Sequence, residues 1–324
     1  MQQTPHHLRN HISKAEAFKK LAKEDFSRRV ISFYRYVILE NPEVLRNELF
    51  AEWQELGVLG RVYLATEGIN AQVSVPEPNF EQFKTLLYAR PAFQDVPFKV
   101  GVEQKHDAFW KLTVKVRKQI VADGLPAHEY DVTNVGTHLT AREWNKLSSD
   151  PEAVVVDMRN NYESAIGRFD DALTPDARTF KEELPLVKET LHGKEDKKVL
   201  LYCTGGIRCE KASAYLKHHG FQQVFQLHGG IIDYAHQIER EGLESKFKGK
   251  NFVFDHRLSE RITEDVLGQC FNCGTACDDY TNCTNVECNR LFIQCGECRK
   301  KLDGFCSATC QPEVEAQGLE LVTA

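Results

Sequence analysis

The feature that most restricts how this chain can fold is the crowding of its cysteines. Eleven cysteines occur in 324 residues, and nine of them lie between residues 270 and 310. That stretch has few other apolar residues, so it cannot bury enough surface to fold without cross-links. Two Cys-x2-Cys pairs and four further cysteines at knuckle-like spacing predict two tetrahedral four-thiolate metal sites. The expected ligands are Cys270, Cys273, Cys283, Cys288, Cys295, Cys298, Cys306 and Cys310.

Four thiolates around one ion leave no open coordination position, which indicates structural Zn²⁺ rather than a catalytic metal. Two such ions are expected, and Cys277 is the spare thiol because it lacks a partner at regular spacing. Spacing alone does not assign the ligands to the two ions, since the sites can interleave. An iron–sulfur cluster is the alternative, and it would matter because iron can activate oxygen. Disulfides are a third interpretation that fits a cytosolic chain poorly.

The composition is that of a folded protein with more than one domain. With 42% hydrophobic residues and no low-complexity tract, the chain is expected to form two or three domains. It starts with polar and charged residues, and no apolar run approaches the ~18 residues that cross a membrane. A cytoplasmic location without a membrane partner is therefore expected. The net charge of −6 means that any contact with RNA must come from a local basic surface.

Residues 1–125 show the element order of a ferredoxin-like, or acylphosphatase-like, α+β domain. The apolar periodicity predicts a strand, a helix, two strands joined at Gly68-Ile69-Asn70, a second helix and two more strands. The expected ranges are 30–37, 42–56, 61–75 for the strand pair, 80–88, 98–102 and 112–121. This order is βαββαβ with one added strand.

Residues 126–243 change to strands that alternate with helices, which predicts a parallel α/β sheet. This domain is expected to carry the chemistry, and residues 244–324 are expected to form the metal-binding region. The expected strands are 153–156, 198–202 and 223–227, and the expected helices are 141–147, 180–191, 208–218 and one that begins near Gly230.

A loop after the strand at 198–202 carries the candidate nucleophile. Cys203 ends the strand, two glycines allow a tight turn, and a helix is expected to start near Arg208. The loop Cys203-Thr204-Gly205-Gly206-Ile207-Arg208 is expected to point its N–H groups at the sulfur and so to hold an anion. These groups and Arg208 should lower the pKa of Cys203 and give a thiolate that acts as a nucleophile or carries a persulfide.

Other interpretations of these residues remain. Cys203 can be a small buried residue that ends a strand, as most free cysteines are. Cys209, just beyond the loop, can be a resolving thiol for Cys203 or can face the core. Asp157, Arg159 and Glu163 follow the neighbouring strand at the same end of the sheet, so they can hold substrate or form a structural ion-pair and capping set.

The loop from Cys203 to Arg208 matches the Cys-x4-Arg loop of rhodanese domains, and Asp157-Met158-Arg159 resembles their Asp-x-Arg signature. The resemblance covers about residues 134–242 and implies a rhodanese-like fold. One departure is Gly167-Arg168-Phe169, where these domains commonly have Gly-His before an apolar residue. That position usually supports the fold, so the role expected for Cys203 is unaffected.

Three segments narrow the resemblance: Asp157 to Glu163 (DMRNNYE), Cys203 to Ser213 (CTGGIRCEKAS) and Gly249 to Asp255 (GKNFVFD). Together they resemble the bacterial tRNA uridine hydroxylase family over nearly the whole chain. The resemblance implies an O2-dependent conversion of the wobble uridine, position 34 of tRNA, to 5-hydroxyuridine, with Cys203 essential. It also implies that the partner is tRNA, bound through its anticodon loop, and that residues 1–125 form an RNA-binding domain.

As a hypothesis for the chemistry, Cys203 adds to C6 of uracil and makes C5 an electron-rich carbon that reacts with oxygen or a peroxide. The sequence has no GxGxxG fingerprint and leaves the electron donor and the oligomeric state unidentified. The main alternative is a sulfurtransferase that moves sulfane sulfur through a Cys203 persulfide. A third is a non-enzymatic RNA-binding or redox-sensing protein.

Basic and aromatic residues are interleaved in two stretches that are candidates for RNA contact. Taken alone, such charges are more often a solvated face, and such aromatic residues are more often core. The candidates are Phe109, Trp110, Lys111, Lys115, Arg117, Lys118, Lys246, Lys248, Lys250, Phe252, Phe254, Arg257 and Arg261.

Overall fold

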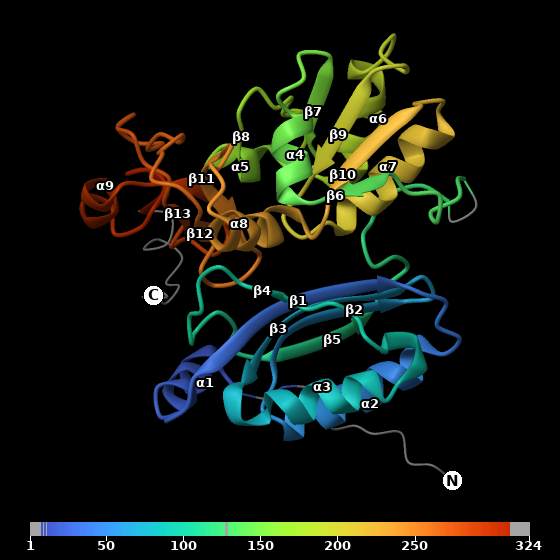
Figure 1. Cartoon of the computed structure of the whole chain (residues 1–324). Coiled ribbons are helices and arrows are strands. Elements are labelled where there is room, and N and C mark those ends of the chain that lie inside the picture. The colour runs from blue at the N-terminus through green and yellow to red at the C-terminus, as the bar shows by residue number, and fades with distance from the viewer. Residues whose placement is uncertain (1–7, 9, 11, 127–128, 312–324) are drawn as a thin grey trace.

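The computed structural model describes residues 8, 10, 12–126 and 129–311. They form an α+β domain, an α/β domain above it and a cysteine-rich tail at the side of the α/β domain (Figure 1). The predicted combination of α+β and α/β parts is confirmed. Among the described residues, none of the helices has the length and apolar character needed to cross a bilayer. The first seven residues, on which the expected lack of a targeting segment rests, are outside this range.

The first domain is a five-stranded sheet with the strand order β4-β1-β3-β2-β5. Neighbouring strands are antiparallel except β2 and β5, which are parallel. This is the predicted ferredoxin-like order with one added strand. Its elements are α1 (Lys14–Leu21), β1 (Arg28–Tyr36), α2 (Pro42–Glu55), β2 (Leu59–Ala65), β3 (Gly68–Pro76), η1 (Glu77–Asn79), α3 (Phe80–Tyr88), η2 (Pro91–Phe93), β4 (Lys99–Val100) and β5 (Leu112–Val116).

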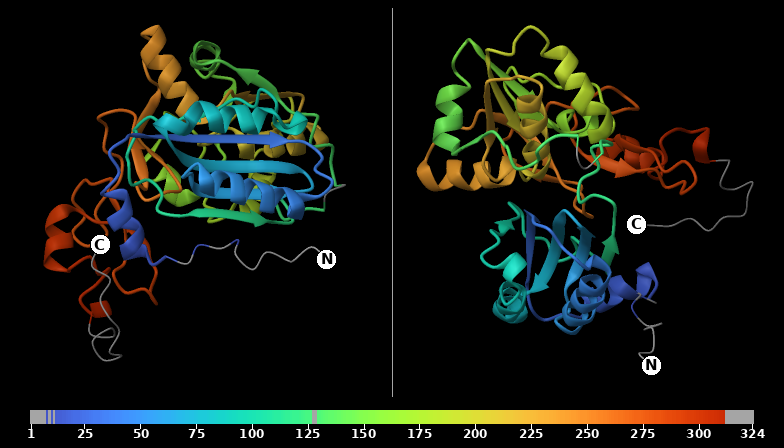
Figure 2. Two further views of the ribbon diagram at one scale, coloured as in Figure 1. Left: turned by 90° about the horizontal axis from the view of Figure 1, so that it is seen from below. Right: turned by 90° about the vertical axis from the view of Figure 1, so that its right-hand side faces the viewer.

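Helices α2 and α3 cover one face of this sheet, and the other face is turned toward the α/β domain (Figures 1 and 2). Side chains alternate between the two faces of a strand. Phe33 of β1 therefore joins the core that contains Trp53 and Phe83. Its neighbours Ser32 and Tyr34 are only partly buried, and both line a cavity on the opposite face. The alternation thus gives the first domain a polar face that looks at the second.

Three details of the first domain differ from the prediction. The chain turns at residues 66–67, before the predicted Gly68-Ile69-Asn70. Gly68 is already in β3, where a Cβ would lie 2.0 Å from the carbonyl oxygen of Arg35, so this glycine serves close strand approach. The expected strand 112–121 ends at Val116, because the Glu67 carboxylate accepts the N–H of Ile120 at 2.7 Å and draws it off the sheet edge.

The expected strand 98–102 is also shorter, with only Lys99 and Val100 in β4. Beyond it, the amide oxygen of Gln104 accepts the N–H of Val30 at 2.7 Å. A side chain therefore takes the place that a backbone carbonyl would occupy in a longer strand.

The second domain is a parallel sheet with the strand order β6-β10-β9-β7, as alternating strands and helices predicted. Its elements are β6 (Thr137–Leu139), α4 (Ala141–Leu147), β7 (Ala153–Asp157), α5 (Asn161–Ser164), β8 (Gly167–Phe169), α6 (Phe180–Thr190), β9 (Lys198–Tyr202), α7 (Ile207–His218), β10 (Gln223–Leu227) and α8 (Gly230–Glu241).

Both faces of this parallel sheet are buried, which explains why its strands read as continuous apolar runs. Val199 and Leu201 of β9 pack in one cluster with residues of α6 and α7. Leu200 and Tyr202 pack in the other cluster with residues of α4 and α8. The central strand β9 therefore delivers Cys203, the next residue, to the carboxyl end of the sheet.

The tail is joined to the second domain by a small separate sheet. Strand β8 pairs with β11, and β11 pairs with β12, all antiparallel. Beyond it, β13 and β14 pair with each other and α9 follows. The bounds of these elements are β11 (Phe247–Phe252), β12 (Ser259–Arg261), β13 (Tyr280–Asn282), β14 (Leu291–Ile293) and α9 (Gly296–Lys301).

Polar contacts fix the first domain against helix α7 of the second. The Tyr34 hydroxyl donates to a Glu210 carboxylate oxygen at 2.8 Å. The Lys211 ammonium, whose side chain is 1% exposed, lies 3.0 Å from Glu67 and 3.1 Å from Asp123. A buried lysine is stable only when its charge is paired. This pairing therefore favours one relative position of the two domains.

Two glycines at the ends of α8 provide a matched test of the loop packing. Both have a positive φ, +68° at Gly230 and +60° at Gly242. A Cβ on Gly230 would lie 2.5 Å from the carbonyl oxygen of Cys203, whereas one on Gly242 would meet nothing within 4 Å. We expect Gly242→Ala to lower the free energy of unfolding by about 1 kcal/mol and Gly230→Ala by at least ~2 kcal/mol more, measured by chemical denaturation. Equal losses would contradict the close packing of α8 on the loop.

Candidate active site

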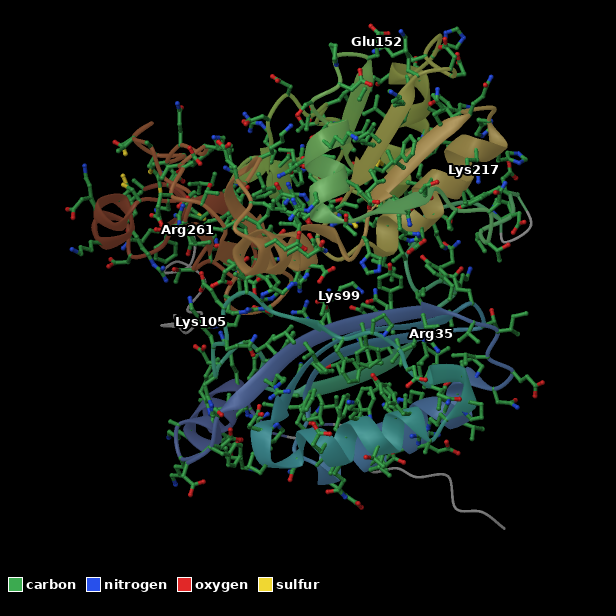
Figure 3. The ribbon with its side chains drawn as sticks, in the orientation of Figure 1. Arg35, Lys99, Lys105, Glu152, Lys217 and Arg261 are labelled. Atoms are coloured by element: carbon green, nitrogen blue, oxygen red, sulfur yellow. The ribbon has the colours of Figure 1, made fainter. Side chains whose placement is uncertain are left out.

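A cavity of about 370 Å³ lies between the first sheet, the Cys203 loop and the turn that joins β11 to β12. The first sheet contributes residues of β1, β2, β3 and β4 to it. The loop contributes Cys203, Thr204, Gly205, Ile207 and Arg208. Figure 3 shows Lys99 in the space between the two domains. The loop predicted to be catalytic therefore borders a cavity whose second wall belongs to a different domain.

Cys203 follows β9 directly and is fully buried, yet it lines this cavity. The backbone N–H of Gly206 donates to its sulfur at 3.1 Å. Burial alone would raise the pKa of Cys203. The Cys209 thiol, the Arg208 charge and the N–H groups of Cys209 and Arg208 together outweigh it and lower the pKa to about 6. Cys203 is therefore largely a thiolate at neutral pH.

Gly206 is the residue at which the loop has to be glycine. Its φ is +95°, and a Cβ there would lie 2.9 Å from the Tyr34 hydroxyl oxygen. The left-handed conformation lets the backbone turn its N–H toward the sulfur. The missing side chain also lets β1 of the first domain approach the loop.

Arg208 is held by Glu163 and does not point freely into the cavity. Its Nη1 donates to Oε1 of Glu163 at 2.6 Å, and its Nη2 donates to Oε2 at 2.8 Å. Glu163 also accepts the Thr204 hydroxyl at 3.2 Å. This two-point pairing neutralises a buried cation and fixes its plane. Glu163 is thus a supporting residue that holds the loop cation in position beside Cys203.

Asp157 and Arg159 form a second buried ion pair, away from the cavity lining. Arg159 donates to both Asp157 oxygens, at 2.8 and 2.7 Å, and to the carbonyl oxygen of Gly167. The Tyr202 hydroxyl donates to Asp157 at 2.7 Å. These contacts join β7, β9 and β8, so this pair stabilises the sheet end from which the loop emerges.

Burial raises the pKa of two groups near the loop, Cys209 and Glu183. Burial, followed by the adjacent Cys203, raises the pKa of Cys209 well above its ordinary value, so Cys209 keeps its proton. Cys209 also belongs to the core cluster on the α6 and α7 side of the sheet. Burial raises the pKa of Glu183 well above its ordinary value.

Sequence reasoning missed the contribution of the first sheet to this site. Ser32 and Tyr34 of β1, Gln72 of β3 and Lys99 of β4 all line the cavity. The signal was the alternation within these strands, which places polar residues on the face opposite the apolar core. The alternation alone does not show that this face of the sheet lies across the cavity from the Cys203 loop.

The eight predicted ligand cysteines come together in two groups of four. One group is Cys270, Cys273, Cys295 and Cys298, and the other is Cys283, Cys288, Cys306 and Cys310. The sulfurs of Cys273 and Cys295 are 3.7 Å apart, and those of Cys283 and Cys310 are 3.8 Å apart. Four thiolates at ~2.3 Å from a tetrahedral zinc are about 3.8 Å from one another. Both groups therefore fit such an ion, and their ligands interleave along the chain.

Several basic residues proposed for RNA contact are paired within the protein. Lys250 lies 2.9 Å from Asp278 and 2.6 Å from Asp279. Arg261 lies 2.7 Å from Asp278. These aspartates belong to the tail, which is why the stretch looked like a free basic surface in the sequence. By contrast, Phe109 and Phe254 of the aromatic candidates line the cavity.

Comparisons with known proteins cover nearly the whole chain. Three family models match it: UPF0176 acylphosphatase like domain at residues 28–120, Rhodanese-like domain at 140–237 and Rhodanase C-terminal at 248–311. A protein of Leptospira interrogans named tRNA uridine(34) hydroxylase is 55% identical over 94% of this chain and 83% of its own length. Proteins of the same name from Pectobacterium carotovorum and Yersinia enterocolitica are 46% and 47% identical, each over 95% of this chain and 87% and 88% of their own lengths.

The thiolate can be tested by the pH dependence of alkylation. The rate at which iodoacetamide labels Cys203 should rise with pH and reach half its maximum near pH 6, because the thiol loses its proton there. Labelling is followed by mass spectrometry of the Cys203 peptide. The double variant Glu163→Gln/Arg208→Met removes the ion pair without leaving one buried charge alone. It should move the midpoint upward by about one pH unit. A wild-type midpoint near the ~8.5 of a free thiol would contradict the thiolate.

Proposed function

The chain belongs to the tRNA uridine(34) hydroxylase family, and from this membership and the geometry of the cavity we propose that it hydroxylates the wobble uridine of tRNA to 5-hydroxyuridine. The observation that carries the proposal is the Cys203 thiolate on the wall of a cavity of about 370 Å³. Sites that enclose a small ligand start at ~300 Å³. The space therefore suits one nucleoside that has left the base stack of an anticodon loop.

We assign Cys203 the role of the nucleophile. Its sulfur adds to C6 of uracil, and the electrons of the C5–C6 double bond move to C5 and to the O4 carbonyl as an enolate. C5 is then electron-rich and takes one oxygen atom from O2. Loss of the C5 proton and departure of the sulfur from C6 restore the double bond. The second oxygen atom leaves as water, with two electrons supplied by an external reductant.

The surroundings of Cys203 suit this role. The Gly206 N–H at 3.1 Å, Arg208 and the Cys209 thiol favour the thiolate before attack and accept it again as the leaving group. Glu163 keeps Arg208 in place, so the cation stabilises the sulfur without blocking the cavity. In this proposal Thr204, Gly205, Gly206 and Ile207 form the loop that supports the sulfur, and Asp157 and Arg159 support the sheet beneath it.

The alternative is a sulfurtransferase, for which a Cys203 persulfide in a Cys-x4-Arg loop would be sufficient. Sulfur transfer from thiosulfate needs only the loop. That reaction makes no use of the residues that β1, β3 and β4 add to the cavity, whereas a nucleobase is bound by contacts on more than one side. The family and the cavity therefore both favour the hydroxylase.

We further propose that each cysteine group of the tail binds one structural Zn²⁺. All four positions of each ion would be thiolates, so the metal supplies cross-linking and no chemistry. Strand β11 pairs with β8 of the second domain, and the turn after β11 lines the cavity through Val253, Phe254 and Asp255. The two ions would thus hold the tail that supports the third wall of the site.

The catalytic role is tested by nucleoside analysis of tRNA. Cells that lack the gene receive wild-type, Cys203→Ser or Cys277→Ser protein, and 5-hydroxyuridine is measured by liquid chromatography and mass spectrometry. Cys203→Ser should lower the product more than ~10³-fold, as loss of a nucleophile does. Cys277→Ser, outside both cysteine groups, should retain it. Full product with Cys203→Ser would exclude the proposed role, and Cys203-dependent thiocyanate formation without any 5-hydroxyuridine would favour the sulfurtransferase.

The metal proposal is tested by elemental analysis of the purified protein. Wild type and Cys277→Ser should each contain two zinc ions per chain. Cys273→Ser should lose one, because three thiolates and a hydroxyl bind Zn²⁺ much more weakly than four thiolates. A strong chelator should unfold the tail, seen as protease cleavage after residue 262. Iron with visible absorption, or no metal in protein that resists cleavage, would contradict two structural zinc sites.

A further inference from the structure

The register of the first sheet places three polar residues in one row on its cavity face. Lys99 of β4 pairs with Ser32 of β1, and Ser32 pairs with Gln72 of β3. Neighbouring strands are about 4.8 Å apart, so the row crosses roughly 10 Å of the sheet. All three residues line the cavity that Cys203 also lines. The row therefore faces the same ligand space as the nucleophile.

These three side chains have unused hydrogen-bonding capacity. Within the described part of the chain, Ser32 and Gln72 form no side-chain hydrogen bond, and Lys99 forms neither a hydrogen bond nor an ion pair. Each side chain is only partly buried, so the lack of a hydrogen-bond partner within the protein does not destabilise the fold. Polar groups that line a cavity and are bonded to nothing in the protein are available to a ligand.

Lys99 contacts the Tyr34 ring with its ammonium group and passes the Cys203 loop with its stem. Its ammonium nitrogen lies 4.4 Å from the centroid of the Tyr34 ring. Its Cδ lies 3.8 Å from where a Cβ of Gly205 would be, so its stem passes the Cys203 loop. Burial lowers the pKa of Lys99, and Asp233, Cys203 and Glu210 act in the opposite direction. A cation positioned in this way can donate to a neutral carbonyl oxygen beside the loop.

The row matches the edge of uracil that carries O2, N3–H and O4. That edge presents an acceptor, a donor and an acceptor in sequence. A carboxamide such as that of Gln72 can accept from N3–H and donate to O2, while an ammonium donates to O4, the position at which cytosine has a donor. In cytosine the ring nitrogen is an acceptor and the exocyclic group is a donor, so the same residues would be left unpaired.

We propose that Lys99, Ser32 and Gln72 form the surface that recognises the Watson–Crick edge of the target uracil, with Lys99 donating to O4. The inference rests on the proposed function, since it names how the substrate base is selected at the same site. It assigns the first domain a direct part in substrate choice: the α/β domain supplies the nucleophile, and the first sheet supplies specificity.

The test is a binding experiment that does not depend on turnover. Full-length protein is titrated without oxygen against a fluorescent anticodon stem-loop with uridine at position 34 and against the same stem-loop with cytidine there. Wild type should prefer uridine by at least about tenfold. Lys99→Met and Gln72→Leu should each weaken uridine binding about tenfold, leave cytidine binding unchanged and so remove the preference. Lys99→Arg keeps a donor and should retain part of it.

The control is Lys84→Met, the same substitution on α3, which covers the other face of the sheet (Figure 1). It should leave both affinities unchanged, and melting curves should show that all variants are folded. Equal weakening of both stem-loops by Lys99→Met would mean a phosphate contact and overturn base recognition. An unchanged preference in Lys99→Met and Gln72→Leu would also overturn it. If wild type makes 5-hydroxyuridine while these variants keep the preference, only this inference fails; if wild type makes none, the proposed function fails.

Discussion

The structure depends on keeping one buried sulfur negatively charged. Burial opposes the charge on Cys203, and a protein interior offers little solvation to replace water. The Gly206 N–H, the Cys209 thiol and Arg208 supply that replacement. Arg208 is itself buried and needs a partner, which Glu163 provides through two short hydrogen bonds. The loop sequence thus supplies only part of what stabilises the thiolate. Glu163 on α5, in the connection after β7, supplies the rest by pairing with Arg208.

The second domain does not form the site by itself. Its cavity is closed by the first sheet, whose polar face would otherwise look into solvent. The Lys211 ion pairs with Glu67 and Asp123 hold the two domains in one register. With the domains in this position, Lys99 and Gln72 line the same cavity as Cys203. The ferredoxin-like domain therefore forms one wall of the cavity beside the rhodanese-like loop, and in the proposed recognition of uracil this wall selects the base.

The cysteine-rich tail contributes to the cavity through the turn after β11. Because β11 extends the small sheet that begins at β8, its position follows from the second domain. The cysteine groups then hold a segment with almost no core of its own, in which Phe292 and Phe305 cluster with three of the cysteines. The ion pairs of Lys250 and Arg261 with Asp278 bind this segment to β11 and β12. Lys250 and Arg261, two of the basic residues that suggested RNA binding, thus hold the tail against the small sheet.

The sequence by itself determined the features that are encoded locally. Strand and helix periods predicted the βαββαβ order and the parallel sheet. The spacing of the cysteines indicated the eight that cluster, and the strand–glycine–helix elbow singled out Cys203. The shortened ends of β4 and β5 were missed because side chains of Gln104 and Glu67, from other segments, capture the backbone there.

Only the tertiary structure decided what lies opposite Cys203 and which charges are free. Glu163 is 45 residues from Arg208 along the chain, and Lys99 is in a different domain from the loop it passes. Such pairings arise from the summed packing of whole domains, which no window of neighbouring residues contains. Periodicity and turn chemistry determine each element over a few residues. The site forms only where the first sheet, the Cys203 loop and the turn after β11 come together.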